Sequence, residues 1–256
     1  MIAAAKPSRS GAAARIIFIV MSLLVFAALL ALGTWQVKRL QWKEALIASI
    51  AARTAAPAST IADMEQRLAG TGDVDYWPVR VSGVFEHANE QHFFATHKGL
   101  TGYYVYTPLR LADGRALFVN RGIVPFDQKE AAVRLDGQLA GTVTVTGLAR
   151  NRLDRKPSWV VPDNDPGKNI YYWKDLTAMA RSSGYDIQTE IVPLFVDADD
   201  TPNPGGLPVG GVTIIELPNN HLQYAITWYG LAAALAGVFG FWYLRQHTSA
   251  GKGEDA

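Results

Sequence analysis

The sequence predicts an α+β protein in which a strand-rich extramembrane domain is tethered by an N-terminal and a C-terminal transmembrane helix. Two long runs without charged residues lie near the two ends of the chain, and seven short stretches rich in β-branched and aromatic residues lie between them. The composition agrees, since 49% of the 256 residues are hydrophobic and 18% are charged. The sequence therefore predicts a protein that combines a membrane anchor with a polar domain.

The two uncharged runs have the length of membrane spans. Ile16 to Trp35 is a run of 20 residues, and Leu222 to Leu244 is a run of 23 residues. A helix rises about 1.5 Å per residue, so roughly 20 residues cross a bilayer core of about 30 Å. Aromatic residues near the ends of both runs are typical of the headgroup region. We expect transmembrane helices at residues 16–36 and 221–244.

The first run is better explained by an anchor than by a cleavable signal peptide. Its apolar stretch exceeds the roughly 7–15 residues of a signal-peptide core, and a bulky Trp35 follows the one cleavage-like triplet, Ala31-Leu32-Gly33. Apolar residues at helical spacing also continue beyond the membrane, as far as Pro57. The helix is therefore expected to extend past its membrane span.

Basic residues favour one orientation in the membrane. The tail at residues 1–15 contains Lys6, Arg9 and Arg15 and no acidic residue, whereas the tail at residues 245–256 carries no net charge. Basic flanks tend to stay cytoplasmic, and two spans put both tails on the same side. We therefore expect two cytoplasmic tails and, at residues 37–220, a domain in the periplasm or the equivalent intermembrane compartment.

The middle domain is predicted to be built mainly from strands. The seven β-rich stretches are Val79–Phe85, Gln91–Thr96, Tyr103–Leu111, Ala116–Val124, Thr142–Leu148, Ile191–Val196 and Gly211–Leu217. Asp113-Gly114 predicts a tight hairpin turn, and Trp173–Ser183 followed by Gly184 predicts one short helix. Proline and glycine make Thr201–Pro208 a loop.

The sequence contains few of the residue patterns that carry catalysis or ligand binding. There is no cysteine, which excludes disulfides, thiolate chemistry and cysteine-ligated zinc, iron–sulfur or haem sites. A net charge of +1 argues against nucleic-acid binding, and neither a nucleotide-binding loop nor a nucleophile–base pair is evident. His87, His92 and His97 are spaced by five, which fits solvated histidines better than converging metal ligands. The residues alone therefore point to no catalytic site, and the expectation that the protein is not an enzyme comes from the resemblance given below.

His221 differs from the other histidines because it opens the second membrane helix. On a helix, Tyr224 and Trp228 follow it at i+3 and i+7, so an imidazole, a phenol and an indole share one face at the membrane surface. A neutral imidazole there is suited to be an axial ligand of haem iron. The same residues also fit an ordinary interfacial aromatic belt, and the pattern alone does not decide between these readings.

The first helix carries a comparable face just outside the membrane. Trp35, Arg39 and Trp42 lie at i, i+4 and i+7. They also fit an anchoring belt with one snorkelling arginine. Facing His221, Arg39 would be able to neutralise a carboxylate such as a haem propionate.

Five blocks of residues, in this order, are similar to the surfeit locus protein 1 family over about residues 32–229. The blocks are Leu32-Gly33-Thr34-Trp35-Gln36 with Arg39 and Trp42, Val81-x-Gly83-x-Phe85, Gly102-Tyr103-x-Val105-x-Thr107-Pro108-Leu109, Val119-Asn120-Arg121-Gly122, and Pro218-Asn219-Asn220-His221-Leu222 with Tyr224, Thr227 and Trp228.

The resemblance implies a membrane assembly factor for haem-a-containing cytochrome c oxidase. It implies transient binding of haem a, with His221 as the axial iron ligand, Tyr224 and Trp228 against the macrocycle, and Arg39 or Arg121 on a propionate. Arg121 equally fits a charge at a strand end. The implied partners are the catalytic subunit of the oxidase, haem a synthase and the lipid bilayer. The alternative is a structural chaperone that docks on the nascent subunit without binding haem.

Overall fold

The structure is a computed structural model that describes residues 9–250. It divides into two compact units. The first, here called the helix pair, contains the chain up to Ala48 and from Glu216 onward, and the second, here called the barrel unit, contains Ser49–Ile215. The portions of the predicted tails at residues 1–8 and 251–256 lie outside the described residues.

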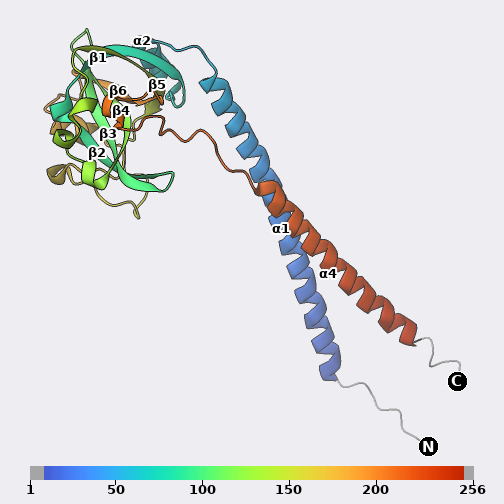
Figure 1. Cartoon of the computed structure of the whole chain (residues 1–256). Coiled ribbons are helices and arrows are strands. Elements are labelled where there is room, and N and C mark those ends of the chain that lie inside the picture. The colour runs from blue at the N-terminus through green and yellow to red at the C-terminus, as the bar shows by residue number, and fades with distance from the viewer. Residues whose placement is uncertain (1–8, 251–256) are drawn as a thin grey trace, which may run out of the picture. The chain divides into compact units, whose positions relative to one another are not determined.

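The helix pair consists of α1 (Arg9–Thr54) and α4 (His221–Ala250), which pack antiparallel (Figure 1). Phe18 stacks on Phe239 with ring centroids 6.3 Å apart, and Gln36 contacts His221 toward the other end. On each helix these two contacts are 18 residues apart, which is about 27 Å of helix and close to the thickness of a bilayer core.

Apolar side chains of the helix pair face outward, as they do where the surrounding medium is lipid. Ile17 is 63% exposed and Val238 is 69% exposed. Both helices are long and apolar enough to cross a membrane. The expected extension of the first helix beyond its span agrees with the structure, because α1 ends at Thr54, shortly before Pro57.

The barrel unit is built on six strands: β1 (Pro78–Phe85), β2 (Gln91–His97), β3 (Leu100–Arg110), β4 (Ala116–Pro125), β5 (Thr142–Asn151) and β6 (Ile191–Ala198). They are paired in the order β1-β5-β6-β4-β3-β2, and a further short pairing of β1 with β3 closes five of them into a ring. Only β4 and β6 run parallel. Small β-barrels host unrelated functions, so the architecture assigns none here.

Both faces of the central strands are buried, which explains their almost continuous apolar sequence. Leu117 and Val119 of β4 point into one core with β1, β5 and α2 (Ile61–Thr71), while Phe118 points into a second core beneath α3 (Leu176–Ser182). These six strands confirm six of the predicted strands. Gly114, at φ 89°, confirms the predicted turn before β4.

The seventh predicted strand, Gly211–Leu217, is wrong, since this segment has no regular structure. Every strand of the closed ring already has a neighbour on each side, so no ring edge is free to pair with it. Thr213 is instead attached through a side chain, donating from Oγ1 to Asp197 Oδ2 at 2.8 Å.

The helical predictions in the barrel unit need two corrections. The helix expected at Trp173–Ser183 begins only at Leu176, because the Asp175 carboxylate accepts from the Ala178 amide and caps it there. The sequence reading missed α2 altogether, although Thr60 and Asp63 form a reciprocal capping box at its start.

Candidate functional site

His221 meets a buried polar side chain at one end of the helix pair. Its Nδ1 lies 2.7 Å from Oε1 of Gln36 on α1. Gln36 is only 8% exposed, whereas the residues around it are mostly apolar. The predicted start of the second helix is confirmed, because α4 begins at His221 and the Asn219 side chain accepts from the His221 amide at 3.4 Å.

The contact with Gln36 determines which imidazole nitrogen carries the proton. A carbonyl oxygen can only accept a hydrogen bond, so Nδ1 must be the donor, and the neutral ring then has its lone pair on Nε2. Metal-binding histidines commonly donate their other ring N–H to an acceptor in this way, which fixes the orientation of the ring. The His221 side chain is therefore oriented with an available nitrogen lone pair.

Tyr224 and Trp228 follow His221 on the same side of α4, at the border between its packed and exposed faces. The packed face is marked by Ala225 and Ala232, each 2% exposed. Tyr224 is 54% exposed, and Trp228 is half-buried. The structure thus places the predicted aromatic side chains one and two turns from His221 on one helix, with surface left for a ligand.

Arg39 lies on α1, one turn beyond Gln36, and remains exposed. Its guanidinium stacks on the ring of Trp42, 3.7 Å from the ring centroid. Trp35 is 56% exposed. A cation held flat on an exposed aromatic ring keeps its charge available to an anion.

Arg121 belongs to the barrel unit rather than to the helix pair. It lies within β4, is 2% exposed, and donates to the Gly137 carbonyl and to Asn203 Oδ1. The alternative of a strand-end charge is therefore wrong. Burial lowers the pKa of Arg121 to about 10, with the nearby Arg134 charge acting in the same direction and Glu90 opposing it.

The three histidines of the predicted strand region have separate surroundings. His87 bonds to Leu139, His92 bonds to Glu90, and His97 lies beside the Tyr104 ring. The expectation of solvated histidines is wrong for His92, which is 3% exposed. Among the residues that the structure describes, no three histidine, aspartate or glutamate side chains converge on a point that would hold a metal ion.

Sequence reasoning missed Gln36 as a site residue. The glutamine lies in a helix whose buried positions are otherwise apolar or small, and a polar side chain there signals an interhelical partner. The partner itself is 185 residues away in sequence, so only the packing of α1 on α4 reveals it. The arrangement as a whole can offer one nitrogen ligand, flanking aromatic surfaces and a nearby cation.

Comparisons with known proteins identify similar sequences over most of the chain. Residues 23–233 match the SURF1 family. Surfeit locus protein 1 of Rattus norvegicus is 40% identical over 222 residues, covering 79% of this chain and 68% of the relative. The Homo sapiens protein of the same name is 38% identical over 233 residues, covering 84% and 73%. A SURF1-like protein of Drosophila melanogaster is 31% identical over 240 residues, covering 86% and 75%. The chain belongs to the SURF1 family.

Proposed function

We propose that this protein is a membrane assembly factor for haem-a-containing cytochrome c oxidase, binding haem a and assisting its delivery to, or stabilisation in, the catalytic subunit. Membership in the SURF1 family supports the assembly role. The hydrogen bond between His221 Nδ1 and Gln36 Oε1 carries the haem-binding part, because it leaves Nε2 as the ligand nitrogen. Two helices able to cross a membrane support a site at the bilayer.

The residues near His221 have complementary roles in this proposal. His221 ligates the iron, and Tyr224 and Trp228 pack against the macrocycle with their exposed ring surfaces. Haem a, when bound, supplies an iron centre with an open coordination position and two carboxylates. Arg39, held on Trp42, pairs with one of those carboxylates.

Transient binding follows from how little of the site is enclosed. A single half-buried histidine with neighbours that remain exposed holds a ligand weakly enough to release it. The protein then acts as a carrier and not as an enzyme. Its partners in this proposal are the bilayer, the catalytic subunit of the oxidase, which receives the haem, and haem a synthase, which supplies it.

We propose the following topology in the cell (inner) membrane. Residues 16–36 and 221–244 cross the membrane, residues 1–15 and 245–256 are cytoplasmic, and residues 37–220 face the periplasm or intermembrane compartment. The basic residues of the first tail support this orientation. Reporter enzymes fused after residue 110 and after residue 256 test it, and activity of a cytoplasmic reporter at the first position would reverse the assignment.

The spectrum of the purified chain tests haem binding. Coexpressed with haem a synthesis, the full chain is expected to carry a Soret band that His221→Ala abolishes and His247→Ala, a control on the same helix, retains. Gln36→Leu removes the acceptor and is expected to weaken binding by about 10- to 100-fold. Haem-free wild-type protein, or equal binding by His221→Ala, would reject the carrier role. If His221→Ala also restored oxidase assembly, the docking chaperone would be favoured.

A further inference from the structure

Arg121 is a buried cation without a carboxylate partner among the described residues. Its guanidinium donates to the Gly137 carbonyl, to Asn203 Oδ1 at 2.9 Å and to His87 Nδ1 at 3.3 Å, all of which are neutral acceptors. The Phe85 ring lies beneath it, with Cζ 4.8 Å from the ring centroid. A charge removed from water in this way is unfavourable unless an anion compensates it.

His87 is held in the neutral form that this arrangement needs. Its Nε2 lies 3.0 Å from the Leu139 carbonyl, so Nε2 carries the proton and Nδ1 accepts from Arg121. Burial lowers the pKa of His87; the Leu139 carbonyl opposes this, and the charges of Arg121 and Arg134 add to it. The imidazole therefore positions the guanidinium without adding a second charge.

Glu90, the buried carboxylate whose charge acts on Arg121, is bonded to other side chains. It accepts hydrogen bonds from Arg134 and from His92 Nε2, the latter at 3.2 Å. Arg134 and Glu90 are 6% and 5% exposed, so this ion pair is enclosed in the barrel unit. Glu90 is thus the ion-pair partner of Arg134 and not of Arg121, which leaves an excess of positive charge beside Arg121.

The backbone segments around Arg121 are closely packed. A Cβ on Gly122 would lie 2.0 Å from the Val209 carbonyl oxygen, and one on Gly137 would lie 2.2 Å from that of Leu207. The Asn203 amide is held in turn by donating to the Pro208 carbonyl. The loop that follows β6 is therefore packed directly against β4 and the Gly137 turn, which fixes the position of the guanidinium.

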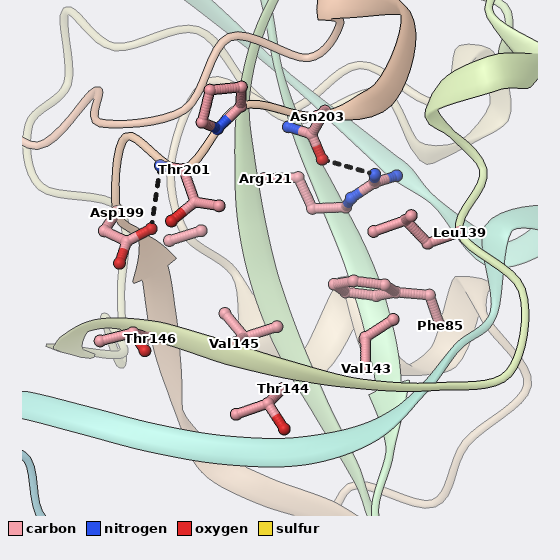
Figure 2. Close-up of a pocket in the computed structure, with 12 residues that line it drawn as sticks. Phe85, Arg121, Leu139, Val143, Thr144, Val145, Thr146, Asp199, Thr201 and Asn203 are labelled. Atoms are coloured by element: carbon pink, nitrogen blue, oxygen red, sulfur yellow. Dashed lines mark hydrogen bonds between the residues drawn. The ribbon is translucent and has the colours of Figure 1, made fainter.

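Arg121 lines a cavity of about 120 Å³, which exceeds the roughly 10–15 Å³ that one water molecule requires. Figure 2 shows Arg121 and Asn203 together at one side, Phe85, Leu139 and Val143 along the wall, and Asp199 at the other end. The cavity thus combines a cationic end with an apolar wall, and it carries a carboxylate away from the cation.

We propose that this cavity is a binding site for a short aliphatic carboxylate, whose carboxylate group pairs with Arg121 and whose carbon chain lies against Phe85 and Val143. The planar guanidinium matches the geometry of a carboxylate, and the volume favours an acid of a few carbon atoms. The site is a property of the barrel unit and does not depend on His221.

Calorimetric titration of the full chain in detergent with sodium propionate tests the site, with sodium chloride at equal ionic strength as the control. We expect saturable binding of propionate, weaker binding of octanoate and none of chloride. Arg121→Met is expected to weaken binding at least tenfold, and Arg121→Lys to lie between it and the wild type because a lysine lacks the two-pronged geometry.

Val143→Phe keeps Arg121 and its hydrogen bonds but fills the cavity, so it tests the site even if Arg121→Met fails to fold. We expect it to abolish propionate binding while retaining the melting temperature of the barrel unit. Asp199→Asn removes the opposing carboxylate and should strengthen binding severalfold. No saturable propionate binding by the wild type, equal binding by Val143→Phe, or competition by chloride would overturn the proposal.

A second titration, with haem in place of propionate, shows whether the cavity binds a free short-chain acid or a carboxylate group of haem. Propionate binding that is unchanged in His221→Ala places the site in the barrel unit, as proposed. If only haem bound, and its binding required Arg121 and His221 together, the independent carboxylate site would be rejected. The Soret band of the wild-type chain reports on the haem proposal separately, so either proposal can fail alone.

Discussion

The helix pair and the barrel unit use polar residues in opposite ways. In the helix pair, exposed side chains are largely apolar and a few polar groups, such as Gln36 and Thr34, meet partners on the other helix. In the barrel unit, buried polar groups are numerous and most are paired. A polar contact between the helices therefore marks a candidate site in the helix pair, whereas in the barrel unit the informative group is Arg121, a buried cation that pairs with no carboxylate among the described residues.

The largest effect is expected where the barrel unit does pair its charges. Glu90→Gln leaves the buried Arg134 without its ion-pair partner and removes a negative charge that favours the charged form of Arg121, so it should lower the free energy of unfolding by about 3–5 kcal/mol. Urea denaturation of the full chain, followed by tryptophan fluorescence, measures this loss.

The partly exposed pair of Glu65 with Arg115 provides the matched control. Glu65→Gln should change the free energy of unfolding by less than about 1 kcal/mol, since the two side chains are 26% and 32% exposed. Equal losses for both variants would show that burial does not distinguish these ion pairs, and the argument for an excess charge at Arg121 would weaken with it.

A smaller effect is expected from the close packing of the helix pair. A Cβ on Gly33 would lie 2.8 Å from the Tyr229 ring, so Gly33→Ala should push the helices apart at a loss of about 1–3 kcal/mol. Because the chain has no cysteine, the disulfide rate of a Phe18→Cys and Phe239→Cys pair reports helix contact without interference. In membranes, we expect Gly33→Ala to lower the disulfide rate of this cysteine pair severalfold relative to the same pair with Gly33.

Gly230→Ala is the control for this helix contact, because no atom lies within 4 Å of a Cβ at that position. Its cross-linking rate should equal that of the parent pair. A fall of the same size in both variants would attribute the change to helix propensity instead of to packing against Tyr229.

Local features, such as individual strands, could be predicted from the sequence. Features that depend on how the strands close into a ring could not. Six strands followed from their residue types, and Leu117–Val119 shows why, since both faces of β4 are buried there and these three residues are apolar. Gly211–Leu217 has the same β-rich composition but pairs with no strand, and the closed ring offers it no free edge. Strand propensity alone does not reveal how many edges the fold leaves free.

The candidate sites divide in the same way. His221 was identifiable because its position at a helix start and its i+3 and i+7 neighbours are local features. Gln36 and the buried surroundings of Arg121 were not, because their partners come from distant segments, including Asn203 in the loop after β6. Predicting them requires knowing which helices and loops pack together.

A modest pH dependence is expected from the barrel unit. The lowered pKa of His87 means that the unfolded chain binds its proton more readily than the folded one. The contribution of His87 to stability is therefore complete above pH 6.5 and falls as the pH drops through that value. His87→Gln should reduce the difference in free energy of unfolding between pH 7.5 and pH 5.5. An unchanged difference would mean that His87 is protonated equally in both states.

The smallest effect is expected from the second polar contact of the helix pair, between Thr34 Oγ1 and Tyr229 Oη at 3.0 Å. Thr34 also donates to the Leu30 carbonyl of its own helix, so its proton is used there and Tyr229 must be the donor. Tyr229 is 39% exposed, and its hydroxyl can find other partners when the contact is lost. A double-mutant cycle of Thr34→Val and Tyr229→Phe, read by the same cysteine cross-link, should give a coupling of about 0.6 kcal/mol. A coupling above about 2 kcal/mol would mean that this bond, and not the close approach at Gly33, holds the helices together.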